Sequence, residues 1–211
     1  MPKNNMPGPS LIAAIMAGSS LMPGYRDQLA IENIALHEKQ QAQFLKTAIS
    51  AAGGTPIMKP TFDLSGGKGS GNGPFKDAFK NYGLFLAVAQ TLEDTGVRAY
   101  KCQAGYLKGT GAILTAALNI HSVEARHASH IRQMRMNNNL ATLKPWITGK
   151  DTGGIGDLVQ ANYNGEEVTN QSGVEIVNIN GKQISYSDAT ESFDEPLSKD
   201  EVSKLVDGFI V

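Results

Sequence analysis

Two stretches of the sequence decide the fold, Phe85-Leu-Ala-Val-Ala-Gln-Thr-Leu-Glu-Asp-Thr-Gly-Val-Arg-Ala-Tyr100 and Ala116-Ala-Leu-Asn-Ile-His-Ser-Val-Glu-Ala-Arg-His-Ala128. In both, apolar residues recur every three to four positions, which is the spacing of an amphipathic helix. The pattern predicts one helix over residues 81–107 and another over residues 112–136. Because residues three and four apart share a helix face, each stretch has a broad apolar stripe that should face a core.

Each of these apolar stripes also contains acidic residues. Glu93 lies in the middle of the first stripe, and Glu124 and His127 lie in the second. A carboxylate in an apolar stripe is costly unless it is paired or binds a metal. The Glu-x-x-His spacing is that of the ligands in carboxylate-bridged di-metal bundles. A lone Glu-x-x-His is more often a solvated surface turn, but the in-phase apolar residues favour a buried site.

The two quoted runs resemble the third and fourth core helices of the ferritin-like domain family. Phe44-Leu-Lys-Thr-Ala48 and Phe193-Asp-Glu-Pro-Leu197 also resemble this family, in the branch of plant desiccation-related proteins and their bacterial homologues. The resemblance covers most of residues 25–211. It implies a mainly α fold, an antiparallel helical bundle. It is much less specific for function, because many members of the branch have no established activity.

The helix before these two is predicted over Asp27–Ser50, with Asp27 as its cap and Gly53-Gly54 as its stop. In the family, the corresponding helix carries a Glu-x-x-His motif. Here the motif is Glu38-Lys-Gln-Gln41, so the acid is kept and an amide replaces the imidazole. His37 is adjacent but points about 100° away on a helix of 3.6 residues per turn, so we expect it at the surface.

The resemblance implies a set of metal ligands in the helical bundle. A complete di-metal site takes a Glu from each of two helices and a Glu-x-x-His from each of the other two. No glutamate precedes Glu32, and Leu11–Met22 is too short for a bundle helix of about 20 residues. The first core helix is therefore predicted to be missing or shortened, and di-iron oxygen chemistry is in doubt. The implied metal ligands are Glu38, Glu93, Glu124 and His127.

Two functions remain open at this stage. In the first, the protein has a degenerate metal site and a structural, stress-related or assembly role, with its buried acids held by hydrogen bonds, Arg98, Arg126 or protons. In the second, it binds iron or manganese and has weak oxidase or storage activity, with Tyr100 as a hydrogen-bond donor behind the ligands. No catalytic residue and no site for an organic cofactor is predicted, so whether the chain is an enzyme stays open.

The predicted organisation has three parts. Residues 1–24 form a flexible leader or a remnant of the first helix, residues 25–146 the bundle, and residues 147–211 an extension that packs on the bundle or on a neighbouring subunit. A missing first helix would leave an apolar groove, which another copy, a partner chain, the N-terminal segment or the C-terminal tail would fill.

The connections carry three local signals. The crossover over residues 51–74 contains Gly66–Gly73, which lacks the spacing and the preceding strand of a phosphate-binding loop. Two β-prone runs around Asn180-Gly181 predict a hairpin over residues 174–186. Ser198 and Glu201 form a capping-box pattern, which predicts a short helix to about residue 207.

Composition excludes several classes of protein. A net charge of −1 does not indicate a nucleic-acid-binding surface, and the single cysteine, Cys102, excludes an internal disulfide and a cysteine zinc site. No apolar run reaches the roughly 20 residues that span a bilayer. The pattern of a signal peptide is weak, because only one cation, Lys3, precedes the apolar stretch Leu11–Met22. Localisation therefore stays open, although the resemblance suggests export.

Overall fold

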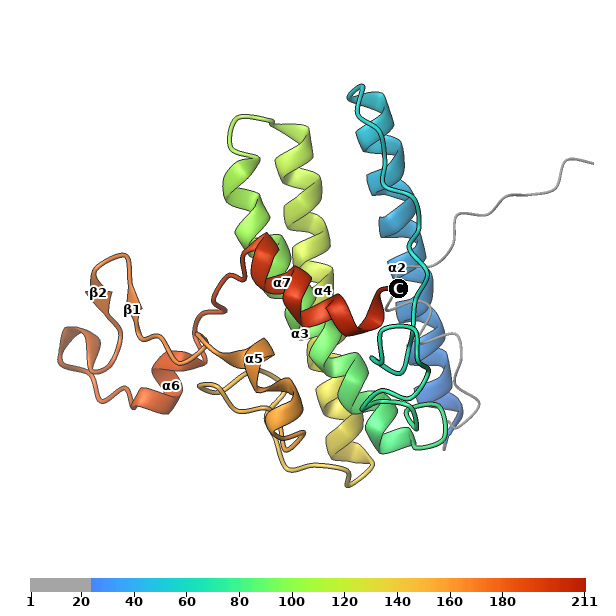
Figure 1. The fold of residues 1–211 in the computed structure, drawn as a ribbon. Helices are drawn as coiled ribbons and strands as arrows, with labels where there is room; N and C mark the ends of the chain where they lie inside the picture. The colour runs from blue at the N-terminus through green and yellow to red at the C-terminus, as the bar shows by residue number, and fades with distance from the viewer. Residues whose placement is uncertain (1–23) are drawn as a thin grey trace, which may run out of the picture. The chain divides into compact units, whose positions relative to one another are not determined.

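The computed structural model describes residues 24–211 and is mainly helical, which confirms the predicted fold class (Figure 1). Its three long helices are α2 (Tyr25–Ala51), α3 (Tyr82–Tyr106) and α4 (Ala112–Asn137). The shorter elements follow in chain order: η1 (Asp157–Val159), α5 (Gln160–Tyr163), β1 (Asn170–Gln171), β2 (Val174–Glu175), η2 (Ile179–Gly181), α6 (Tyr186–Thr190), α7 (Lys199–Val206) and η3 (Asp207–Phe209).

The chain forms two compact units. Residues 24–89 and Val206–Val211 belong to the first unit, and Gln90–Leu205 form the second. The predicted leader lies outside the described residues except for Gly24, and the predicted division at residue 147 stays a prediction. Within residues 24–211, no helix is both long enough and apolar enough to span a membrane.

The ends of α2 test the predicted cap and stop. The N-cap is Gly24, without a side-chain cap, so the prediction that Asp27 caps the helix is wrong. Asp27 lies inside the first turn, where its carboxylate accepts a 2.6 Å hydrogen bond from the Tyr82 hydroxyl. The predicted stop is confirmed: Gly53 has φ +79°, and the Gly54 N–H donates to the Ile49 carbonyl at 2.9 Å. A left-handed glycine of this kind satisfies the last carbonyls of a helix.

Helix α2 has apolar residues on more than its buried face. Ile31 and Ile34 are buried and share that face with Glu38. Several large apolar side chains of α2 are exposed, and a helix with such an exposed apolar face is typical of a surface that another segment covers. The predicted partner that would fill a groove at this position stays a prediction. The exposed large apolar side chains of α2 are Tyr25, Leu29, Leu36, Phe44, Leu45 and Ile49.

The glycine-rich crossover is built around the carboxylate of Asp63. This carboxylate accepts hydrogen bonds from the Ser65 hydroxyl at 2.6 Å, the Gly69 N–H at 2.8 Å and the Gly71 N–H at 3.0 Å. These bonds, the one from the Ser65 side chain first among them, lower the pKa of Asp63 to about 2. The Gly69 and Gly71 amides of the loop therefore bind an anion within the chain itself.

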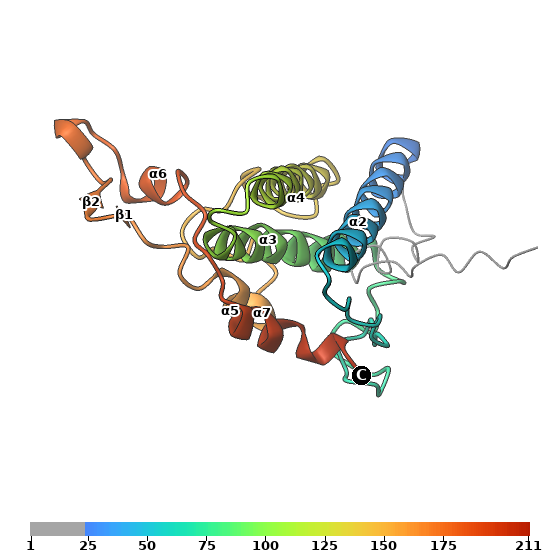
Figure 2. The ribbon, with the colours of Figure 1, turned by 90° about the horizontal axis from the view of Figure 1, so that it is seen from above.

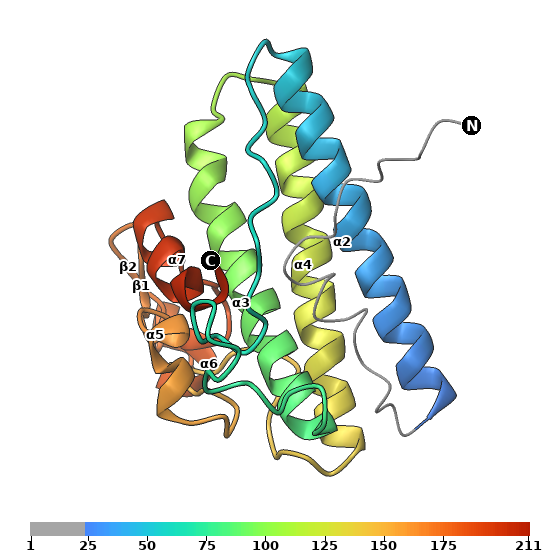
Figure 3. The same ribbon diagram turned by 45° about the vertical axis from the view of Figure 1, so that its right-hand side comes forward.

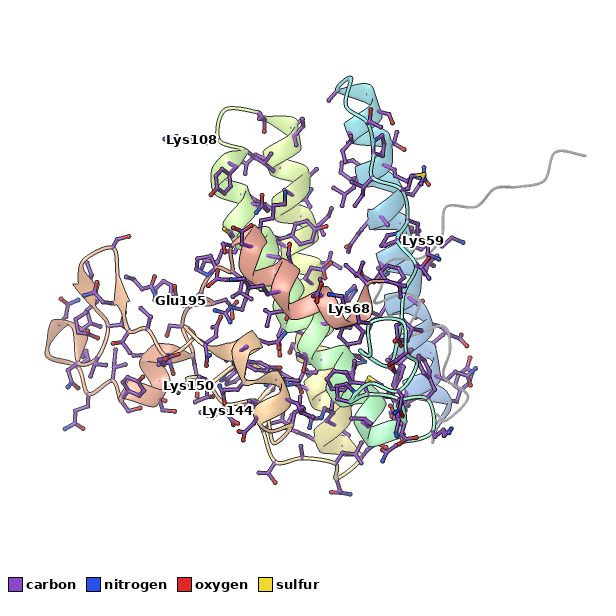
Figure 4. The ribbon with its side chains drawn as sticks, viewed as in Figure 1. Lys59, Lys68, Lys108, Lys144, Lys150 and Glu195 are labelled. Atoms are coloured by element: carbon purple, nitrogen blue, oxygen red, sulfur yellow. The ribbon has the colours of Figure 1, made fainter. Side chains whose placement is uncertain are left out.

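The C-terminal residues pair with the same crossover. The Val211 N–H donates to the Thr61 carbonyl, and the Asp63 N–H donates to the Phe209 carbonyl, both at 3.0 Å. The ring of Phe209 stacks on that of Phe75 with a centroid distance of 5.6 Å. Exposed Lys68, labelled in Figure 4, adds a 2.6 Å ion pair to the same tail. The last residues of the chain thus complete the first unit.

In the second unit, α3 and α4 lie side by side and antiparallel (Figure 2). Buried polar contacts link the two helices. Arg132 of α4 donates to Asp94 of α3 at 2.6 Å, and Arg135 donates to the Gln90 side chain at 2.6 Å. Partner numbers rise on one helix as they fall on the other, so these bonds fix one antiparallel register.

The hairpin exists, but it forms earlier than the sequence pattern predicts. β1 pairs antiparallel with β2 around Ser172-Gly173, and both turn residues have positive φ, as a type I′ turn requires. Asn180-Gly181 also forms a turn, closed by the Lys182 N–H donating to the Ile179 carbonyl at 3.1 Å. No strand pair flanks that second turn, because Asn178 has φ +55°, which ends an extended run.

The capping box is confirmed. The Ser198 N–H donates to the Glu201 carboxylate at 2.7 Å, and the Glu201 N–H donates to the Ser198 hydroxyl at 3.3 Å. These two bonds satisfy backbone donors that a helix start leaves without partners. These two bonds fix the start of α7.

The short helices α5 and α6 and the hairpin lie on one side of the α3–α4 pair (Figure 3).

One arginine anchors the extension to α3. Arg98 is 1% exposed and lies 2.6 Å from the Glu166 carboxylate through its Nε atom. It also donates to the carbonyl of Glu195, labelled in Figure 4, and to the carbonyls of Asn162 and Asn164. A planar guanidinium suits such a multiple contact. Two segments of the extension, residues 162–166 and the stretch around Glu195, therefore converge on one side chain of α3.

Burial of Glu166 gives an expected pH dependence. Burial raises the pKa of Glu166 to about 7, although the Arg98 guanidinium opposes this shift and Asp194 and Glu195 add to it. The folded state then binds a proton between about pH 4.5 and 7 that the unfolded state releases, so stability falls as the pH rises through this window. We expect the unfolding free energy to be higher at pH 5 than at pH 7.5 by at most about 3 kcal/mol from this group.

Urea unfolding at several pH values, compared between the wild type and Glu166→Gln, measures this effect. Glutamine mimics the neutral acid, so its profile should be flatter by the contribution of Glu166. Parallel profiles of the two proteins would show that Glu166 is ionised in the folded state throughout.

Candidate metal centre

Two helices of the second unit bring together three predicted ligands. Glu93 comes from α3, and Glu124 and His127 come from α4, one turn apart. Their exposed fractions are 0%, 2% and 5%. One ligand atom from each lies within 4.8 Å of the others. The register that Asp94 and Arg132 fix therefore places two acids and an imidazole in one buried group.

Glu93 and His127 lie close to each other within this group. The Nδ1 atom of His127 lies 3.3 Å from Oε2 of Glu93. Two ligand atoms on one metal ion lie about 3.0–3.4 Å apart when each bond is about 2.1 Å long. The same separation suits an ion pair if the imidazole is protonated. The donor set and this separation are compatible with both atoms binding one transition metal ion.

Glu38 lies on α2 in the first unit and is 5% exposed. A charged residue is seldom so buried in a helix face otherwise made of Ile31 and Ile34. Glu38 is one of the described acidic and histidine side chains that could hold a metal ion. His37 is exposed, as its helical position predicts, and Gln41 is half-buried.

A buried polar network near Glu93 connects α3 and α4 to the extension. The Tyr163 hydroxyl, fully buried, donates to Asp94 at 2.8 Å and accepts from Gln90 at 3.2 Å. Burial raises the pKa of Tyr163, and the neighbouring Asp94 adds to this, so the phenol keeps its proton and acts as donor. Arg132 pairs with the same Asp94 oxygen at 2.6 Å. The network holds the backbone next to Glu93 in place.

Sequence reasoning missed this network. A signal was present, because Gln90, Asp94 and Arg98 recur at every fourth position and so form a polar row along α3. Its partners Tyr163 and Glu166 lie about 70 residues later in an irregular segment. No local pattern could pair them.

The prediction that Arg98 or Arg126 neutralises the buried acids of the bundle fails for both. Arg98 is directed to Glu166 of the extension, and Arg126 is exposed. Tyr100 is half-buried, and its predicted role as a donor behind the ligands stays a prediction.

Comparison with known proteins gives one family. A family model described as ferritin-like domain matches residues 20–137, more than half of the chain. No curated protein and no solved structure matches. The matched residues contain α2, α3 and α4 and all four predicted ligands. The chain therefore belongs to the ferritin-like domain family.

Proposed function

We propose that this protein binds a single divalent iron or manganese ion through Glu38, Glu93, Glu124 and His127. The observation that carries the proposal is the buried group of Glu93, Glu124 and His127, with 3.3 Å between His127 Nδ1 and Glu93 Oε2. Carboxylate and imidazole ligands suit iron and manganese. Glu38 is included because it is the one buried acid of α2 and stands where the family resemblance expects a ligand.

One ion is favoured over two by the number of ligands. A di-metal site of this architecture uses four carboxylates and two imidazoles. Residues 1–24 contain no Asp, Glu or His, and Gln41 stands where the second imidazole would be. Three carboxylates around one divalent ion leave a net charge of −1, whereas the three carboxylates and one imidazole of the proposed set would leave two ions short of ligands and of compensating charge. A bound iron or manganese ion would supply one-electron redox chemistry at a site closed to bulk water.

The alternative is a bundle without metal, with the structural, stress-related or assembly role that the resemblance to desiccation-related proteins implies. Gln41 favours this alternative, because an amide is at best a weak ligand. The buried acids would then be held by protons and hydrogen bonds.

Metal content separates these two functions. We expect about one iron or manganese per chain, by plasma mass spectrometry, after anaerobic loading with the divalent metal and removal of excess. His127→Ala should lower affinity at least about 100-fold, because it removes the only imidazole ligand. His130→Ala is the matched control, since His130 is exposed on the same helix.

A second pair tests the ligand from α2. Glu38→Gln should weaken binding, and Glu32→Gln, at an exposed position on the same helix, should not. No metal above background in the loaded wild type would support the metal-free bundle. Equal binding by all variants would place the metal elsewhere.

A further inference from the structure

We propose that Gly96 is a positioning residue, which reserves the space that the Glu124 carboxylate needs to act as a metal ligand. This inference rests on the proposed function and adds a residue to it. Gly96 lies on α3 three residues after Glu93, so the two positions share a helix face. Glu124 approaches that face from α4.

The geometry shows why the position is special. A Cβ atom added at Gly96 would lie 2.9 Å from Oε2, 3.7 Å from Cδ and 3.9 Å from Cγ of Glu124. A Cβ contact below 3.0 Å essentially does not occur, so one of the two groups would have to move. The three nearest atoms all belong to Glu124. The missing side chain therefore makes room for one carboxylate and not for general helix packing.

Conformation does not explain the glycine. Gly96 lies inside α3 and does not have a left-handed φ, so its backbone is one that alanine adopts readily. Glycine inside a helix costs about 1 kcal/mol relative to alanine. Glycine therefore lowers the stability of α3 at the position that contacts the predicted ligand Glu124. This indicates that the site requires the space that a larger side chain would fill.

The substitution Gly96→Ala should therefore have opposite effects on the stability of the fold and on metal binding. Gly96→Ala should leave the stability of the metal-free protein unchanged or raise it, because the end of the Glu124 side chain can shift by a few tenths of an ångström. The same shift moves a ligand atom relative to Glu93 and His127. Metal affinity should therefore fall about tenfold or more, since ligand geometry must be held closely.

The test compares the wild type, Gly96→Ala and Gly105→Ala. Gly105 is the matched control, because it also lies in α3 and a Cβ there would meet nothing within 4 Å. Mn²⁺ affinity is measured by calorimetry, the spectrum of bound Co²⁺ reports the ligand geometry, and urea unfolding of the metal-free proteins reports stability. We expect weaker binding and a changed Co²⁺ spectrum for Gly96→Ala alone.

Each outcome decides one question. A wild type that binds neither ion refutes the proposed function itself. A wild type that binds, with Gly96→Ala equal to it in affinity and spectrum, refutes the positioning role only. A metal-free Gly96→Ala protein that is clearly less stable than the wild type and Gly105→Ala would show that the space serves helix packing, and would likewise overturn the inference.

Discussion

Replacing Arg98 with alanine is expected to destabilise the second unit by about 3–5 kcal/mol at pH 8, the cost of breaking a buried ion pair by removing one partner. The change leaves the Glu166 carboxylate buried without its cation and removes the donor to three backbone carbonyls. At pH 5 the loss should be smaller, because Glu166, whose pKa burial raises to about 7, is then neutral in the folded protein.

Urea unfolding followed by the fluorescence of Trp146 measures this loss. Trp146 is the single tryptophan and lies in the second unit, where its ring N–H donates to Glu191. Arg126→Ala, at an exposed position, is the control and should change stability by less than about 0.5 kcal/mol. A cost below 1 kcal/mol for Arg98→Ala at pH 8 would show that the extension is held mainly by other contacts.

Replacing Asp94 with alanine is expected to cost about 3–5 kcal/mol for a related reason. Asp94 is 3% exposed, and one of its oxygens accepts from both Arg132 and the Tyr163 hydroxyl. Without it, the buried Arg132 of α4 loses the anion with which it pairs, and the buried Tyr163 phenol loses its acceptor. The register of α3 against α4 and the attachment of Tyr163 should weaken together.

A double variant distinguishes charge from shape. Asp94→Leu with Arg132→Met replaces the ion pair with apolar groups of similar volume, which is often neutral or stabilising. The double variant should recover most of the stability that Asp94→Ala loses, measured by the same Trp146 fluorescence. Failure to recover would indicate that the hydrogen bond to Tyr163, rather than the ion pair, carries the stabilisation.

The sequence by itself determined the three long helices and, with the family resemblance, singled out the residues of the candidate site. Apolar residues at helical spacing predicted α3 and α4 to within one or two residues, because the period of a helix is a local property. Glu93, Glu124 and His127 stood out for the same reason, as charged residues within apolar stripes. The Gly53 stop and the Ser198 capping box were also local, since each needs only residues one turn apart.

Only the tertiary structure decided which charged groups pair. Arg98 was expected near the buried acids of the bundle, but it lies against Glu166, and Asp27 was expected to cap α2, but it accepts from Tyr82. The hairpin formed at Ser172-Gly173, although the signal at Asn180-Gly181 was stronger in sequence. The space at Gly96 became visible only with Glu124 beside it. A side chain's partner depends on which distant segment fills the neighbouring volume, and no periodicity along the chain records that.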